Sequence, residues 1–328
     1  MAYSAEVVRR ARARLAEAKA DRESENNEHL RIAYQKVPRI KQIDEDLRSS
    51  MALAARAAFS AGEDPGTVME QVKKTNLALQ QEREQLVRFY FEEGYLDDSP
   101  ICEHCSGLGY VGSTMCECLR ELCRQEQKKE LALLTSGMES FDKFRLDYYP
   151  DKVDGQYGLS PRAVMARNFE VCRRFAMLFG SHSGNLLFVG GTGLGKTFLS
   201  ACIARTVAEK GHYVVYESAP HLFSKLERNR FSPSEETAKE AARYTDCELL
   251  IVDDLGTELP GNFVTAALYT LVNDRLLAEK PTVISTNLTI DEIAQRYSPQ
   301  IASRLRGGYQ GLTFVGEDIR VLKNRGVL

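Results

Sequence analysis

The sequence predicts an α/β fold in which a parallel sheet is flanked by helices, preceded by a helical region with a cysteine cluster. Residues 190–197 fit the phosphate-binding pattern G-x-x-x-x-G-K-[ST] and stand between an apolar run, 185–189, and a helical pattern, 198–210. Apolar strands then alternate with helical segments along the rest of the chain. Two of these strands end in polar residues, and a parallel sheet binds its ligands at the carboxyl ends of its strands.

Composition describes an ordinary globular chain of 328 residues, 43% apolar and 27% charged, with a net charge of −3. Because the charge is slightly negative, any nucleic-acid contact has to come from a local basic patch. We expect neither a secretory leader nor a membrane span, since residues 1–19 are charged and no apolar run is long enough. The eight cysteines, four or five of them clustered, favour a reducing, cytoplasmic setting over a disulfide framework.

The first 94 residues are predicted to be helical. Residues 1–26 have few large apolar side chains, so they form a solvated helix or are partly disordered. A second helix is expected to begin at Pro38, since proline is tolerated in a first turn. After a break at 62–66, Thr67 is expected to be the N-cap of a third helix. A helical piece this small has a thin core, so 1–94 is either internally packed or, as we predict, a partner-binding region.

A cysteine cluster follows within residues 95–134, which we predict to be a zinc knuckle and linker helix. A C-x-x-C turn followed by glycines precedes a C-x-C pair, and two such pairs complete a closed, structural Zn²⁺ tetrahedron. Cys123 is an alternative to Cys118 as the fourth metal ligand, and His104 is a weaker alternative. A redox pair or an iron–sulfur cluster is the alternative chemistry. The expected ligands are Cys102, Cys105, Cys116 and Cys118.

Residues 135–328 are predicted to be an ATPase domain built around the glycine-rich run. The glycines let backbone N–H groups converge on phosphate oxygens at a helix N-terminus. Lys196 is expected to reach the β- and γ-phosphates of ATP, and the Thr197 hydroxyl to bind Mg²⁺. A glycine-rich turn without nucleotide is the alternative. The expected nucleotide-binding residues here are Gly190, Gly191, Thr192, Gly193, Leu194, Gly195, Lys196, Thr197 and Phe198.

Acidic and amide side chains end two later strands. The apolar run 249–252 is followed by Asp253, expected to hold Mg²⁺, and by Asp254, expected to orient or deprotonate the attacking water. Glu258 would share that role or pair with a basic residue. Asn287, after the predicted strand 282–286, would bond to the water or the γ-phosphate, although such a residue is often only part of a turn.

Two arginines and an aromatic segment complete the expected site. Arg304, in a short helix after Pro299, would enter a neighbouring subunit's site as an arginine finger. Arg320 would contact nucleotide within the same chain, and either arginine can instead be a surface ion-pair residue. The aromatic segment 140–150 lines an adenine pocket or packs on the sheet. A helix is expected from Pro161 to Phe179.

From about residue 140 to its end, the chain resembles the AAA+ ATPases of the DnaC/DnaI/IstB group. The resemblance rests on the glycine-rich run, on the Asp-Asp-Leu-Gly-x-Glu signature at 253–258, and on the runs 285–288, 303–305 and 316–320. The cysteine knuckle is similar to that of DnaC- or DnaI-type replicative helicase loaders, whereas IstB-type transposition helpers generally lack one. The resemblance implies that Asn287 is a sensor, Arg304 a finger and Arg320 a second sensor.

A basic segment is expected on helices inserted after the second strand, within 217–247. In the group that the chain resembles, this region faces the central channel of a ring. Basic residues beside Phe223 and Phe231 suit a single-stranded nucleic acid, and a solvated helix face is the alternative. The expected DNA contacts are Lys225, Arg228 and Arg230.

The resemblance implies ATP binding, slow Mg²⁺-dependent ATP hydrolysis stimulated by DNA or a partner, and self-association through AAA+ interfaces. The predicted function is an ATP-dependent loader that binds a hexameric replicative helicase and delivers it onto single-stranded DNA at replication initiation or restart. The alternative is an IstB-like ATPase helper of a DNA transposase. A third hypothesis is a non-enzymatic nucleotide switch, against which the intact Lys196, Asp253 and Asp254 argue.

Overall fold

The computed structural model describes residues 3–57, 65–134, 139–153, 158–180 and 182–324. The chain divides into two compact units, Met1–Ala11 together with Arg120–Leu328, and Arg12–Leu119. Helices α1 (Ala5–Lys36) and α4 (Glu117–Leu134) contribute residues to both units. This division differs from the three predicted regions, whose boundaries stay predictions. In the part of the chain described, no helix is both long and apolar enough to cross a bilayer.

A five-stranded parallel sheet is the centre of the larger unit, with strand order β4-β5-β6-β3-β7. This confirms the predicted α/β fold, a parallel sheet flanked by helices. The strand predicted at 282–286 has the expected bounds, and the one predicted at 212–216 lies two residues later. The strands are β3 (Leu186–Val189), β4 (Val214–Ser218), β5 (Leu249–Leu255), β6 (Thr282–Thr286) and β7 (Gln310–Thr313).

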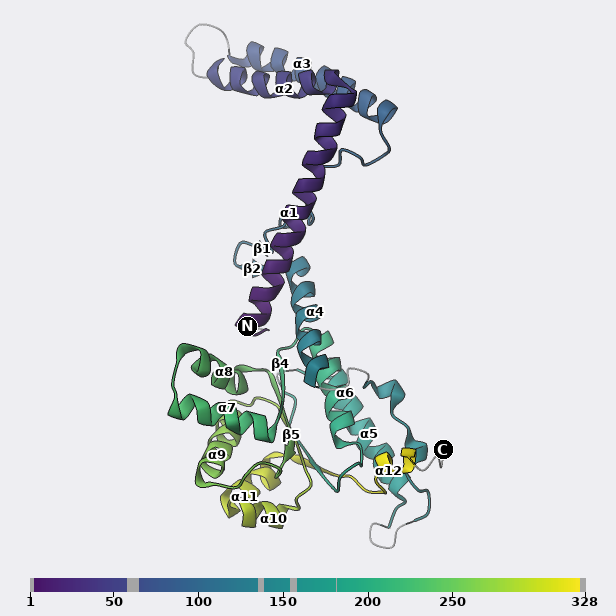
Figure 1. The fold of residues 1–328 in the computed structure, drawn as a ribbon, viewed down its shortest axis with the longest axis vertical. Coiled ribbons are helices and arrows are strands. Elements are labelled where there is room, and N and C mark those ends of the chain that lie inside the picture. The colour runs from purple at the N-terminus through teal and green to yellow at the C-terminus, as the bar shows by residue number, and fades with distance from the viewer. Residues whose placement is uncertain (1–2, 58–64, 135–138, 154–157, 181, 325–328) are drawn as a thin grey trace. The chain divides into compact units, whose positions relative to one another are not determined.

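Apolar side chains of the central strands alternate between two buried cores. In β5, Leu249 and Ile251 pack with residues of α5 and α6, whereas Leu250 and Val252 pack with residues of α7, α9 and α11. Successive side chains of a strand point to opposite faces, so a continuous apolar run requires cover on both faces. Figure 1 shows α5 and α6 on one side of the strands and α7 and α9 on the other.

The helices of this unit connect the strands in the expected alternation. Helix α5 begins at the predicted Pro161, where Ser160 is the N-cap and accepts a 3.2 Å hydrogen bond from the Ala163 N–H. It ends at Met177, two residues before the predicted end. The helices are α5 (Pro161–Met177), α6 (Lys196–Glu209), α7 (Ala219–Phe231), α8 (Glu235–Asp246), α9 (Asn262–Leu277), α10 (Ile290–Arg296), α11 (Pro299–Gly308) and α12 (Ile319–Asn324), with short 3₁₀ turns η1 (Phe141–Lys143) and η2 (Leu146–Tyr148).

Helices α2 (Pro38–Ala57) and α3 (Pro65–Tyr90) pack together in the smaller unit. An ion pair of 2.7 Å joins Arg83 of α3 to Asp44 of α2, and Tyr34 donates a 2.9 Å hydrogen bond to the same carboxylate. Helix α2 begins at Pro38 as predicted. The N-cap prediction for Thr67 was wrong, because α3 already begins at Pro65, a residue that a first turn tolerates. The predicted break at 62–66 lies mostly outside the described residues.

Helix α1 is longer than the sequence suggested, and runs from Ala5 to Lys36 rather than ending near residue 26. Of the two alternatives for residues 1–26, a helix or a partly disordered segment, the helix is confirmed for the described residues. Val7, Ala11 and Leu15 are buried at every fourth position. One of these is only an alanine, so the apolar stripe of this helix is narrow and gives a weak sequence pattern.

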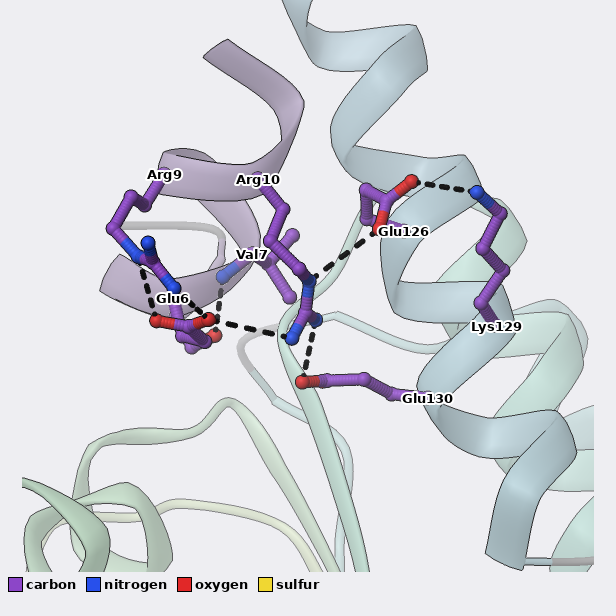
Figure 2. A network of polar contacts seen from close by, with 8 residues as sticks. Glu6, Val7, Arg9, Arg10, Glu126, Lys129 and Glu130 are labelled. Carbon is purple, nitrogen blue, oxygen red and sulfur yellow. Dashed lines mark hydrogen bonds and ion pairs between the residues drawn. The ribbon is translucent and has the colours of Figure 1, made fainter. Parts of the chain in front are cut away.

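Charged side chains tie the first turns of α1 to α4 (Figure 2). The Arg10 guanidinium donates to Glu130 at 2.7 Å, and its Nε lies 3.4 Å from a carboxylate oxygen of Glu126. Glu126 is almost buried, with 7% of its side chain exposed, and also pairs with Lys129 at 2.9 Å. Arg10 therefore compensates a carboxylate that would be costly to bury alone.

Candidate functional site

The glycine-rich run connects the end of β3 to the start of α6, as predicted. Gly195 precedes α6 with a φ of +90°, and a Cβ there would lie 2.9 Å from the Tyr149 hydroxyl. At Gly190, φ is +155° and a Cβ would lie 2.4 Å from the Phe314 carbonyl oxygen. Glycine is therefore required at both positions. The run leads into a helix N-terminus, whose first N–H groups lack partners within the helix.

A cavity of about 370 Å³ lies beside this helix N-terminus. That volume is within the range of roughly 300–1,000 Å³ typical of small-molecule sites. Predicted residues from the loop, β5, β6 and the C-terminal segment meet here, because the carboxyl ends of parallel strands lie at one edge of the sheet. The predicted residues that line it are Thr192, Gly193, Leu194, Gly195, Lys196, Thr197, Phe198, Asp254, Asn287 and Arg320.

The remaining predicted residues of this site lie around the cavity rather than on its lining. Gly190 and Gly191 line an adjoining surface cavity together with Asn287. Asp253 is buried and is not among the lining residues. The sequence reasoning did not single out five further lining residues, although four of them lie in segments that it named: the aromatic segment 140–150, the signature 253–258 and the run 316–320. These residues are Glu139, Lys143, Arg145, Thr257 and Ile319.

Lys196 is 4% exposed and is held by three oxygen acceptors. Its Nζ donates to the carbonyl oxygens of Gly190 and Gly191 at 2.7 and 2.6 Å, and to the Asn287 Oδ1 at 2.7 Å. Burial lowers the pKa of Lys196, and the nearby Asp254 carboxylate opposes that shift. The ammonium group is therefore directed into the turn where a phosphate group would be cradled.

The two adjacent carboxylates of β5 have different surroundings. Asp253 is 5% exposed and accepts hydrogen bonds from the hydroxyls of Tyr216, at 2.6 Å, and Ser285. Asp254 lines the cavity with Lys196. Burial, and after it the charge of Asp253, raises the pKa of Asp254 above its ordinary value, while Lys196 opposes the shift.

Oxygen donors at this edge of the sheet are of the kind that Mg²⁺ prefers. The Thr197 hydroxyl and the Asp254 carboxylate line one cavity, and Asp253 is the next residue along the strand. Each Asp253 oxygen already accepts a hydroxyl hydrogen bond, and each keeps a further lone pair. The donor set therefore fits a divalent cation bound beside phosphate.

The C-terminal segment brings Arg320 to the same cavity. The Ile319 N–H donates to the Gly193 carbonyl oxygen at 3.0 Å, so α12 begins in contact with the glycine-rich run. The Asp318 carboxylate accepts from the Arg320 N–H at 2.8 Å and lies against Gly193. Arg320 therefore lines the same cavity as the glycine-rich run, and its contact with nucleotide stays a prediction.

The aromatic segment before α5 packs on the core and also lines the cavity. Tyr149 is fully buried and donates a 2.9 Å hydrogen bond to the Leu194 carbonyl oxygen. Its ring stacks on Phe144 at 5.9 Å, and Phe144 and Tyr148 also line the cavity. The segment packs on the sheet and supplies an apolar wall on which a flat ring can stack.

Glu258 pairs with a basic residue rather than sharing the role of Asp254. It is 5% exposed, its carboxylate lies 3.5 Å from the Arg296 Nε, and it accepts from the Tyr297 hydroxyl. Because Arg296 and Tyr297 belong to the end of α10, this buried carboxylate links the loop after β5 to that helix. Glu258 is not among the residues that line the cavity.

Comparison with known proteins agrees with this geometry. Residues 166–303 match the family described as IstB-like ATP binding protein. These residues form an IstB-like ATP-binding domain. They include the glycine-rich run, the acidic pair and Asn287, and they end just before Arg304.

Two curated relatives illustrate what the IstB-like domain is similar to. The replicative helicase loader DnaC of Escherichia coli (strain K12) is 22% identical over 139 residues, which are 42% of this chain and 56% of that protein. The insertion sequence IS232 putative ATP-binding protein of Bacillus thuringiensis subsp. berliner is 26% identical over 151 residues, 44% of this chain and 59% of that protein. The chain thus spans somewhat more than half the length of these relatives.

One solved structure can be set beside these relatives. The crystal structure of the DnaC helicase loader is 20% identical to the chain, with a TM-score of 0.45. The alignment covers 53% of this chain and 98% of that one.

Arg304 lies outside the cavity, on α11 at the edge of the IstB-like domain. Its Nε and Nη2 donate to the Asn273 Oδ1 at 3.0 and 2.7 Å, and Nη2 also donates to the Tyr269 hydroxyl at 2.8 Å. The guanidinium lies 4.6 Å from the centre of the Tyr269 ring. Helix α9 therefore holds this arginine, and Nη1 is not used in any of these contacts.

The structure brings the four expected cysteines together in the smaller unit. The Sγ atoms of Cys102, Cys105, Cys116 and Cys118 all lie within 4.8 Å of one another. The Cys102–Cys116 separation is 3.8 Å and the Cys105–Cys118 separation is 3.4 Å. A Zn–S bond of about 2.3 Å in a tetrahedron places sulfurs roughly 3.8 Å apart, so the cluster fits Zn²⁺.

The surroundings of Cys105 favour its thiolate form. Burial alone would raise the pKa of Cys105, but the Gly109 N–H, 3.2 Å from its sulfur, and the other thiols lower it to about 7. At Cys118, in the first turn of α4, burial and the other three thiols instead raise the pKa. The two competing ligands do not join the cluster: Cys123 is buried further along α4, and His104 is exposed.

The basic residues expected to contact DNA are on α7, one of two helices after β4. Lys225 pairs with the buried Glu217 at 2.6 Å, and Arg228 pairs with Glu240 of α8. In the part of the chain described, Arg230 has no carboxylate partner. Its guanidinium lies 5.8 Å from the Phe231 ring and 5.5 Å from the Phe263 ring. Phe231 is 69% exposed, so Arg230 and this ring form an exposed pair beside the half-buried Phe263.

Proposed function

We propose that this chain is a Mg²⁺-dependent ATPase that binds the replicative helicase and delivers it onto single-stranded DNA. The observation that carries the ATPase part is the cavity where the glycine-rich run, Asp254, Asn287 and Arg320 meet. A shared cavity is needed because phosphoryl transfer depends on positioning and on charge stabilisation. Where Mg²⁺ is bound, it would neutralise charge on the β- and γ-phosphates.

The chain's own residues would have separate roles in the reaction. Lys196 would leave its carbonyl acceptors and bind the β- and γ-phosphates, while Thr197 and Asp253 would hold the metal. Asp254 would orient the attacking water and accept its proton, because it is the carboxylate that lines the cavity. Asn287 would hold the water or the γ-phosphate. Phe144 and Tyr148 would form one wall around the adenine.

We propose further that copies of the chain associate in the presence of ATP. Arg304 is not among the residues that line the described cavity, and Nη1 is not used in the contacts to Asn273 and Tyr269. A neighbouring copy can therefore receive this group at its γ-phosphate, where a positive charge stabilises the transition state. The contacts from α9 restrict the side chain, so less entropy would be lost on docking.

The helicase-loading part of the proposal rests on the four-cysteine cluster ahead of the ATPase unit. Loaders of the DnaC or DnaI type carry such a knuckle, and IstB-type helpers generally lack it. The match to the IstB-like family is the observation that favours the second candidate, an ATPase helper of a DNA transposase. The partner therefore has to be identified by a direct binding experiment.

A mass measurement on a mixture of the chain, ATP and the replicative helicase of the same source separates the two candidates. We expect a discrete complex with the mass of a helicase hexamer plus several copies of this chain. The same mixture without nucleotide is the control, and should contain fewer bound copies. If no complex forms and the chain instead makes ATP-dependent filaments on duplex DNA, the helper function replaces the loader function.

Binding of single-stranded DNA is expected to depend more on Arg230 than on its neighbours. Stacking contributes about 1–3 kcal/mol per base, so Arg230→Ala should weaken binding of a labelled oligothymidine about fivefold or more at constant salt. Arg228→Ala is the matched control and should change affinity less, because Glu240 already neutralises that charge. Fluorescence anisotropy gives both affinities. Equal effects of the two substitutions would contradict the assignment.

A further inference from the structure

Ser285 of β6 contacts both acidic residues of β5. Its hydroxyl donates to the Asp253 Oδ1 and accepts a 2.9 Å hydrogen bond from the Asp254 N–H. The side chain is fully buried, with 0% exposed. A buried hydroxyl that donates to one residue and accepts from the next fixes both of them relative to its own strand.

The backbone between these two residues departs from regular strand geometry. Pairing of β5 with β6 shifts register between Val252 and Leu255, and Asp254 has a φ of +55°. A positive φ is uncommon for a residue with a side chain, and persists where the surroundings impose it. The Asp254 N–H points to the Ser285 hydroxyl instead of the β6 backbone, which accounts for the shift.

This irregular turn determines which carboxylate faces the cavity. In a regular strand, neighbouring side chains point to opposite faces of the sheet. One of the two carboxylates would then point into the core on the face away from the cavity. Here Asp253 stays buried, and Asp254 lines the cavity with Lys196 and Asn287. The irregular turn therefore lets Asp254 line the cavity while Asp253, one residue earlier, stays buried.

Tyr216 holds Asp253 from the opposite side. It lies on β4, the other neighbour of β5, and donates a 2.6 Å hydrogen bond to the Asp253 Oδ2. Asp253 is therefore bound by hydroxyl groups from both adjacent strands. Two donors, one on each oxygen, fix the plane of the carboxylate as well as its position.

We propose that Ser285, assisted by Tyr216, is a positioning residue that sets the geometry of the acidic pair for Mg²⁺·ATP. Ser285 sets the turn that presents Asp254 to the cavity, and the two hydroxyls together hold Asp253 at one orientation. The role in turnover rests on the proposed ATPase function. The role in setting the turn does not, because it is a property of the chain without nucleotide.

Ser285→Ala is the test, with Ser200→Ala as its matched control. Ser200 is also fully buried, and its hydroxyl has no hydrogen-bond partner among the residues that the structure describes. Without nucleotide, hydrogen exchange at the Asp254 amide should be at least tenfold faster in Ser285→Ala and unchanged in Ser200→Ala. Fragmentation that resolves single amides is needed for this measurement.

Nucleotide binding and turnover form the second part of the test. In Ser285→Ala, affinity for a fluorescent ATP analogue in EDTA should stay within twofold of the parent, while the gain in affinity on adding Mg²⁺ should shrink. We expect kcat to fall at least tenfold with little change in KM. In Tyr216→Phe, the gain in affinity for the ATP analogue on adding Mg²⁺ should also shrink. Hydrogen exchange at the Asp254 amide should be unchanged, because only Asp253 loses a hydrogen-bond donor.

The outcomes separate this inference from the function on which it partly rests. If Ser285→Ala matches Ser200→Ala in amide exchange and in Mg²⁺-dependent affinity, the positioning role is overturned. If the parent chain neither binds nor hydrolyses ATP, the proposed function fails, and the amide exchange still decides whether Ser285 sets the turn. If Ser285→Ala does not fold, Tyr216→Phe decides: an unchanged Mg²⁺-dependent gain in affinity overturns the proposal.

Discussion

Replacement of Cys105 by serine is expected to remove zinc from the chain and to unfold residues 102–116. This segment contains only a two-strand hairpin, β1 (Tyr110–Val111) with β2 (Thr114–Met115), so it has little apolar area to bury. In sites of this kind, metal binding supplies the folding free energy, and apparent values are about 10–16 kcal/mol in zinc-finger peptides. Zinc content by elemental analysis should fall from about one ion per chain to near zero.

Cys123→Ser is the matched control for this substitution. Cys123 is five residues beyond Cys118 along α4, which is about 7.5 Å along a helix axis. It is buried outside the four-cysteine group, so its replacement should leave the zinc content unchanged. If Cys123→Ser loses the metal and Cys105→Ser keeps it, the ligand set is wrong. A purified parent chain that contains iron and inorganic sulfide would favour an iron–sulfur cluster instead.

Lys196→Ala is expected to abolish ATP turnover, with a loss of at least about 100-fold, because positioning and charge stabilisation of the phosphates carry most of the catalysis. The Lys196 Nζ also donates to two carbonyl oxygens of the glycine-rich turn at 2.6–2.7 Å. Phosphate release from ATP and the affinity for a fluorescent ATP analogue are the two measurements. Both should decline, turnover more than affinity.

Lys210→Ala provides a control on the same helix. Lys210 is at the opposite end of α6, where its ammonium group donates to the carbonyl oxygens of Ala176 and Met177. Lys210→Ala also removes hydrogen bonds from an ammonium group to backbone carbonyl oxygens, but at the end of α6 away from the cavity. ATP turnover should therefore stay within about twofold of the parent, because most substitutions away from a functional site have small effects. Comparable turnover in Lys196→Ala and the parent would show that the cavity is not a site of ATP hydrolysis.

Much of the larger unit follows from local sequence. The apolar runs that became β3, β5 and β6 are continuous, as a strand covered on both faces requires, and the start of α5 is given by Ser160 and Pro161. The cavity follows from the same pattern. Motif residues at the ends of parallel strands are brought together by the sheet itself, so Lys196, Asp254 and Asn287 meet although they are far apart in the chain.

The features that sequence reasoning missed depend on partners from other strands or helices. Ser285 and Tyr216 are ordinary strand residues until β4, β5 and β6 lie side by side, and only then do their hydroxyls reach Asp253. Likewise, Glu258 was left with two possible roles, and its burial against Arg296 and Tyr297 decided between them. The extent of α1 was missed because its buried stripe is narrow.

The sequence by itself determined the glycine-rich turn, the acidic pair, the two cysteine pairs and the alternation of strands and helices, because each is a local pattern with a local cause. The tertiary structure alone decided which carboxylate faces the cavity, which fourth cysteine joins the cluster, and which basic residue of α7 lacks a carboxylate partner among the described residues. These outcomes depend on hydrogen bonds and burial between segments distant in the chain, and no local pattern encodes such contacts.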